Sequence, residues 1–206
     1  MTHTAPTVWD RIEQARARHD VLQHSFYQRW TAGELSAAEL AHYSGQYRHA
    51  VVSIAELSDQ VAAGLPEHEE LAGHAEEERR HVPLWDGFVD AVGGDAAASP
   101  TAETADCVEV WCKRDGALSG LARLYAIESG QPQISQTKLD GLSRHYGVES
   151  ESGTGYFTVH RGRDVEHAAE GRALLEELID GPADEDLVVA AAESAFEANW
   201  RLLDGV

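Results

Sequence analysis

Apolar residues recur every three or four positions along almost the whole chain, and this spacing is the feature that most restricts its fold. In residues 7–31, for example, Val8, Ile12, Phe26 and Trp30 fall on one stripe. Such spacing is typical of amphipathic helices rather than of strands. Alanine, leucine and glutamate are abundant, whereas β-branched and aromatic residues are sparse, and this balance also favours helix. The chain is therefore expected to be all-α.

Turn and capping residues divide this pattern into seven expected helices. They cover residues 7–31, 36–64, 66–93, 101–114, 115–146, 155–180 and 182–203. Gly33 interrupts the pattern, Ser36 is a suitable N-cap, and Pro182 suits the start of the last helix. The segment 147–155, GVESESGTG, has turn chemistry and is expected to be a loop. Short connections, with no repeat or linker, predict one domain spanning residues 1–206, a seven-helix bundle.

The net charge and the cysteine content restrict the compartment and the classes of partner that we expect for this protein. A formal net charge of −20 disfavours binding to nucleic acid or to an anionic membrane surface. No apolar run approaches the roughly 20 residues that span a bilayer, and the amino-terminal segment lacks the pattern of a secretory signal. Cys107 and Cys112 are the two cysteines, too few for a disulfide scaffold. We expect a cytoplasmic protein that binds a small molecule, and a homodimer stays open.

Metal-ligand residue types interrupt the apolar face of the helix expected at 155–180. His160, Asp164 and His167 are spaced i, i+4 and i+7, so they share one face, and Leu174 continues it. A carboxylate and two imidazoles buried without partners are costly, and a divalent metal would supply the missing charge. An exposed, solvated His-Asp-His face is the alternative, and this helix alone leaves both open.

The helix expected at 66–93 shows the same arrangement. His74, Glu78 and His81 lie in the middle of a stripe whose two ends are apolar. Glu77 is one residue aside and could also turn inward. The alternative is that the EEERR sequence forms a charged surface patch, but a surface patch leaves the two histidines unexplained.

The helix expected at 115–146 carries one acid, Glu128, on an otherwise apolar stripe. Pro132 cannot donate to the carbonyl oxygen of Glu128, which predicts a kink there, and Pro83 predicts another in the helix at 66–93. Three helices thus offer nitrogen and oxygen ligands without thiolate or thioether, a set that suits iron or manganese. Six ligand positions exceed one tetrahedral site and imply two metals, as in helical di-iron sites with the E-x-x-H pattern.

On these residues the chain resembles the heme-oxygenase-like di-iron oxidases and oxygenases, a branch of the superfamily with thiaminase-type and pyrroloquinoline-quinone-synthase-type proteins. The likeness covers nearly the whole chain, and its specific part is His81, Glu128 and the H-x3-D-x2-H sequence from His160 through Asp164 to His167. It implies a heme-oxygenase-like bundle of seven helices, two Fe(II) ions (or manganese), and O2 as co-substrate. It further implies that His81, Glu128 and His160 hold one iron and that Asp164 and His167 hold the second, with Glu128 able to bridge.

The same resemblance bears on five further positions. His74 stands where the family usually has a glutamate, so either His74 is itself a ligand, which its register favours, or Glu77 or Glu78 substitutes for it. Lys138 matches a lysine near the irons and implies a catalytic residue that orients oxygen or a substrate carboxylate; a surface lysine is the alternative. Candidates for the substrate pocket are Tyr27, Tyr125 and Tyr156, unless these tyrosines are structural.

The implied activity is the O2-dependent oxidation of a small carboxylate, with a free amino acid in a biosynthetic pathway favoured. Desaturation, C–C cleavage, and C–N bond, ring or nitrile formation are the outcomes that the resemblance implies, and its substrates include fatty acids and a side chain of the enzyme itself. One alternative is a metal-free thiaminase-like or quinone-synthase-like enzyme, but residues 119–129, SGLARLYAIES, lack the cysteine of the thiaminase type. Another is a non-catalytic metal-binding helical protein.

Overall fold

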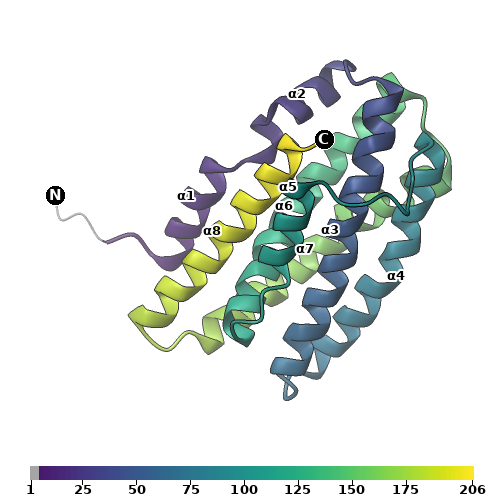
Figure 1. Ribbon diagram of the computed structural model, residues 1–206. Helices are drawn as coiled ribbons and strands as arrows, with labels where there is room; N and C mark the ends of the chain where they lie inside the picture. The colour runs from purple at the N-terminus through teal and green to yellow at the C-terminus, as the bar shows by residue number, and fades with distance from the viewer. Residues whose placement is uncertain (1–4) are drawn as a thin grey trace.

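The structure is a computed structural model that describes residues 5–206, and every regular element in this range is a helix (Figure 1). The α-helices are α1 (Val8–Arg18), α2 (Ser25–Ala32), α3 (Ala37–Gly64), α4 (Glu69–Val92), α5 (Ala102–Trp111), α6 (Ala117–Gly141), α7 (Glu151–Leu178) and α8 (Pro182–Asp204). The all-α prediction is confirmed for these residues; residues 1–4 of the expected domain lie outside them. Within the described range, none of the helices is both long enough and apolar enough to cross a membrane.

The expected count of seven helices is wrong, because residues 7–31 form two helices instead of one. α1 ends at Arg18, and a short 3-10 turn, η1 (Val21–Gln23), follows. Asp20 and His24 each accept a hydrogen bond from the backbone N–H two residues later, at 3.1 Å in both cases. A side chain that caps a new helix start competes with continuation of the preceding helix, so the chain turns here although its apolar stripe continues.

Of the other helix boundaries, some differ from the predicted ones by a few residues and others agree with them. α4 begins at Glu69, not at residue 66, and α7 begins at Glu151, since Ser150 caps it by accepting from Gly153 N at 3.1 Å. The expected loop at 147–155 is correspondingly shorter. The start of α3 is as predicted, because Ser36 and Glu39 form a reciprocal capping box.

The three helices expected to carry metal ligands are neighbours. α3 and α4 form an antiparallel pair, α7 packs against both α4 and α6, and α8 lies against α1, α5 and α6 (Figure 1). The approach of α4 to α7 depends on Gly87, because a Cβ there would lie 2.5 Å from the carbonyl oxygen of Ser152. Both Pro83 and Pro132 lie inside continuous helices, α4 and α6.

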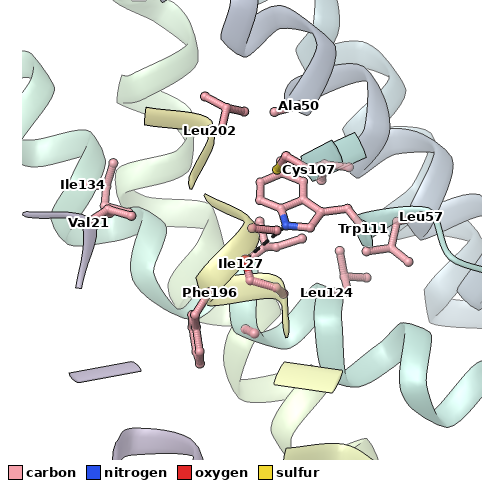
Figure 2. Packing of buried hydrophobic residues seen from close by; sticks show 14 of the residues in the cluster. Val21, Ala50, Leu57, Cys107, Trp111, Leu124, Ile127, Ile134, Phe196 and Leu202 are labelled. Atoms are coloured by element: carbon pink, nitrogen blue, oxygen red, sulfur yellow. Dashed lines mark hydrogen bonds between the residues drawn. The ribbon is translucent and has the colours of Figure 1, made fainter. Parts of the chain in front are cut away.

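Beside these three helices, a hydrophobic core packs against α6. Trp111 of α5 is fully buried and its indole N–H donates to the carbonyl oxygen of Ala195 at 3.2 Å. Figure 2 shows Leu124 and Ile127 of α6 beside Trp111, with Phe196 of α8 nearby. Burying each of these side chains contributes roughly 1.5–3 kcal/mol, and Glu128 follows Leu124 by one turn of α6.

Candidate metal centre

The ligand-type side chains of α4, α6 and α7 converge in the interior. They are His74, Glu78 and His81 on α4, Glu128 on α6, and His160, Asp164 and His167 on α7, each with a side chain at most 10% exposed. A solvated His-Asp-His face and a charged patch that includes Glu78 are therefore both wrong.

Glu78 lies between two groups of potential ligands. One group contains His74, Glu78 and His167, and the other contains Glu78, His81 and His160; within each group, one ligand atom per residue lies within 4.8 Å of the others. Glu78 Oε1 is 3.0 Å from His81 Nδ1 and 4.0 Å from His74 Nε2. A carboxylate shared by two sets of imidazoles has the placement of a bridging ligand in a two-metal site.

Glu128 joins the first group through His74. Its Oε1 lies 2.7 Å from His74 Nε2, yet the approach angle does not make a hydrogen bond, and both atoms are buried without a hydrogen-bond partner. Two atoms that both point towards one shared metal ion would lie this close together without a hydrogen bond between them. The His74 ring also stacks on the His167 ring, with centroids 3.8 Å apart and planes at 7°.

Asp164 orients His160, a potential ligand of the second group. Its two carboxylate oxygens accept from His160 Nδ1 at 3.0 and 2.9 Å, which leaves His160 Nε2 buried and unpartnered. A carboxylate that holds one ring nitrogen fixes the tautomer and aims the other nitrogen at a metal. The rings of His160 and His81 meet edge to face at 4.5 Å.

The donor set fits a pair of divalent cations. Within the described residues, the unpartnered buried atoms of the cluster are His74 Nε2, Glu128 Oε1, His160 Nε2 and both ring nitrogens of His167. Leaving such an atom unsatisfied costs about 1–3 kcal/mol, so a bound partner that satisfies several of them would stabilise the cluster. Imidazole and carboxylate donors without sulfur suit iron or manganese.

The buried acids and histidines shift one another's ionisation. Burial raises the pKa of Glu128 to about 7, against the opposing effect of His74. Burial likewise raises the pKa of Asp164 in spite of its hydrogen bond from His160. The pKa of Glu78 is lowered, because the hydrogen bond from His81 and the surrounding histidines outweigh its burial. Glu78 is thus the acid most readily ionised, as a bridging ligand must be.

Glu77 and Glu78, the two acids considered as substitutes for His74, lie in different positions. Glu78 turns inward, whereas Glu77 is held at the edge by Arg163, whose Nε and Nη2 donate to it at 2.8 and 3.0 Å. Glu77 Oε2 still lies 3.3 Å from His167 Nε2. The grouping also differs from the one expected, because Glu78, not Glu128, is grouped with His81 and His160.

Lys138 is buried, so the surface-lysine alternative is wrong. Its ammonium nitrogen is 4.5 Å from the centre of the Tyr47 ring, and no ion pair reaches it from the described part of the chain. The other rings around it, at 5.2–5.8 Å, belong to Tyr27, Tyr43, Trp85 and Phe157. Burial lowers the pKa of Lys138 to about 7. These aromatic rings form a cage around Lys138, which connects to the candidate metal ligands through Tyr156, whose ring lies 4.9 Å from Trp85 and 4.0 Å from His160.

The three tyrosines expected at the substrate pocket lie in two places. Tyr27 and Tyr156 belong to the buried aromatic cluster around Lys138. Tyr125 lies elsewhere and lines a cavity of about 30 Å³ together with His74, Glu128 and His167.

Comparisons with known proteins agree with this architecture. A 4-aminobenzoate synthase of Nitrosomonas europaea is 31% identical over 228 residues, which cover 100% of this chain and 92% of that protein. A 4-aminobenzoate synthase of Chlamydia trachomatis serovar D is 28% identical, over 95% of this chain and 90% of its own. A crystal structure from Shewanella denitrificans, described as a domain of unknown function with a heme oxygenase-like fold, matches with a TM-score of 0.82 at 19% identity, over 98% of this chain and 92% of that one.

This last match confirms the heme-oxygenase-like fold predicted from the sequence. The family model described as "Iron-containing redox enzyme" matches residues 21–200, which is most of the chain and includes all the ligand-type residues described above. The chain therefore belongs to the family of iron-containing redox enzymes.

Proposed function

We propose that this protein is a non-haem oxygenase that binds two Fe(II) ions between α4, α6 and α7 and uses O2 as co-substrate. The position of Glu78 between two pairs of buried histidines carries the proposal. His74, His167 and Glu128 would hold one ion, His81 and His160 the other, and Glu78 would bridge them. Asp164 would orient His160 or ligate directly, and manganese could replace iron in such a donor set.

The chain's own residues would position the substrate and move protons. Bound in this centre, the metal ions would supply the electrons that activate dioxygen. Lys138, with its pKa lowered to about 7 by burial, can be either an ammonium or a neutral amine at neutral pH. It can therefore orient a substrate carboxylate or exchange a proton within the aromatic cage. The surrounding rings exclude water from this space.

We infer that the product is 4-aminobenzoate, because relatives with this name match the chain along its whole length. The first candidate for the source of its ring is a free amino acid, in keeping with the family resemblance. The cavity beside His74 and Glu128 holds about 30 Å³, room for about two water molecules, so a free aromatic amino acid would need the helices to part.

A second candidate source, favoured by this small cavity, is a tyrosine side chain of the protein itself. Tyrosine carries a benzene ring with one carbon para to its oxygen, the carbon skeleton of a para-substituted benzoate. Tyr156 lies against His160 with ring centres 4.0 Å apart, and Tyr27, Tyr43 and Tyr47 surround the amine of Lys138. Each of these rings is buried.

One experiment tests the function and separates the two sources. Protein grown with ring-13C tyrosine is loaded anaerobically with Fe(II) and exposed to O2 with a panel of unlabelled amino acids. Labelled 4-aminobenzoate, detected by mass spectrometry, identifies an internal tyrosine, and unlabelled product identifies a free substrate. Absence of product, with oxygen uptake that no substrate changes, would instead indicate the metal-binding, non-catalytic alternative.

A further inference from the structure

A cation must pass from solvent to ligands that are almost completely buried. The cavity of about 30 Å³ lies between α4, α6 and α7, and His74, Glu128 and His167 form part of its lining. Its apolar lining consists of Leu71, Leu121, Leu124, Tyr125, Gly171 and Leu174. His167 is only 1% exposed and both of its ring nitrogens lack a hydrogen-bond partner, so an unpartnered ligand faces this space.

Two exposed carboxylates also line the cavity. Glu70 and Glu170 have side chains 63% and 62% exposed. Glu170 Oε2 lies 3.8 Å from His167 Nδ1, so this carboxylate reaches both solvent and a buried imidazole. Carboxylate oxygens can replace waters of a hydrated cation one at a time, and paired negative charges raise the local cation concentration.

We infer that this cavity is the portal through which a divalent cation reaches the metal centre, with Glu170 passing the ion to His167 and Gly171 keeping the path open. The inference rests on the proposed two-metal function. It assigns roles to Glu170 and Gly171, neither of which belongs to the metal-ligand pattern found in the sequence.

Gly171 permits a matched test of the path. A Cβ at this position would meet only Tyr125, at 3.8 Å and 4.0 Å, an ordinary contact, so alanine fits. The longer side chain of leucine would occupy a cavity with room for about two waters. Alanine and leucine are both strong helix formers, and Gly171→Ala and Gly171→Leu therefore differ in bulk rather than in support for α7.

The test measures the rate of Co(II) uptake by metal-free protein, by stopped-flow absorbance, with the final metal content measured separately. Gly171→Leu is expected to slow uptake on the order of tenfold or more, because the helices must then move before the ion enters, whereas Gly171→Ala keeps the wild-type rate. Glu170→Gln should slow uptake and weaken its dependence on ionic strength. Glu177→Gln, an exposed carboxylate on α7 away from the cavity, serves as its control.

The outcomes separate the portal from the metal centre itself. Equal uptake rates in the alanine and leucine variants would overturn the portal and leave the two-metal proposal standing. Failure of the wild-type protein to bind Co(II) or Fe(II) at all would overturn the two-metal proposal. If Gly171→Leu does not fold, Glu170→Gln decides, and an uptake rate equal to that of Glu177→Gln overturns the portal.

Discussion

At the scale of single residues, Glu77 and Glu78 are adjacent in sequence but lie in different surroundings. Arg163 holds Glu77 at the edge of the cluster, and Glu78 is buried among four histidines. Spacing on one helix predicts that His74 and His81 share a face, and the structure places both inside. Spacing could not separate the two glutamates, because the arginine that engages Glu77 lies 86 positions later in the chain.

This difference leads to the first prediction. Glu78→Gln should bind fewer than one metal ion per chain under conditions where the wild type binds two, because an amide keeps the shape but loses the charge shared by both groups. Glu77→Gln should keep both ions, with weaker binding on the His167 side. Metal content after anaerobic Fe(II) loading and desalting measures this, with the exposed Glu76→Gln as control. Two ions retained by Glu78→Gln would mean that Glu128 is the bridging acid.

A second prediction concerns Lys138 in the metal-free protein. Burial lowers its pKa from 10.5 to about 7, so between these values the unfolded chain holds a proton that the folded chain has released. The free energy of unfolding therefore rises with pH across this window. Lys138→Met removes the amine and should stabilise the fold by up to about 5 kcal/mol near pH 7, with the gain vanishing as pH approaches 10.5.

Urea denaturation of the wild type and Lys138→Met across this pH range gives the difference directly. The control is Lys113→Met, since Lys113 has a side chain 67% exposed and its loss should leave the difference flat with pH. A stability gain that does not change between pH 7 and 10 would show that the amine titrates normally in the folded chain.

At the scale of elements, apolar periodicity located most helices but missed the break after α1. Six of the expected helix starts fall within three residues of those observed, because caps such as Ser36 and Pro182 have sequence signatures. The turn at residues 19–24 has no glycine or proline. The residues that cap the new helix starts there are Asp20 and His24. Because the apolar stripe continues past both of them, the pattern predicts one continuous helix.

The third prediction follows from the cap of α2. His24 Nδ1 accepts from the backbone N–H of Phe26, and its Nε2 contacts Asp204 at 3.1 Å. His24→Ala should destabilise the protein by about 1 kcal/mol more than His24→Asn, because asparagine can replace the cap while both variants lose the Asp204 contact. Urea midpoints measure this, and equal midpoints would show that the cap contributes nothing to stability.

At the scale of the whole molecule, the sequence could identify which helices carry candidate metal ligands but not which of their faces meet. Periodicity marks the inward side of α4, α6 and α7 one helix at a time, and the family resemblance supplied the expectation that they converge. Their contact depends on features distant in sequence, such as the close approach of Gly87 to Ser152. The shared position of Glu78 and the separation of Tyr125 from Tyr27 are consequences of that packing, so neither could be predicted.

The metal centre should also couple to the stability of the whole chain. The buried acids and unpartnered imidazoles weaken the metal-free fold, and cations that bind only the folded state stabilise it by mass action. At Fe(II) or Mn(II) concentrations about a hundredfold above the dissociation constant, the melting temperature should rise by about 5–10 °C for each ion bound. Glu78→Gln should show no such rise, and Mg(II) should give less than Fe(II), because imidazole ligands favour transition metals.

The metal-dependent rise in melting temperature should be larger at higher pH. The pKa of Glu128 is raised to about 7 by its burial, and the pKa of His74 is raised because Glu128 and its other acidic neighbours outweigh burial. Near pH 5.5 both groups therefore hold protons that a cation must displace, whereas near pH 8 the Glu128 carboxyl has largely released its proton and can bind. Thermal melts with and without Mn(II) should give a larger rise at pH 8 than at pH 5.5. An equal or smaller rise at pH 8 would mean that the stabilising cations bind at surface acids rather than at the buried cluster.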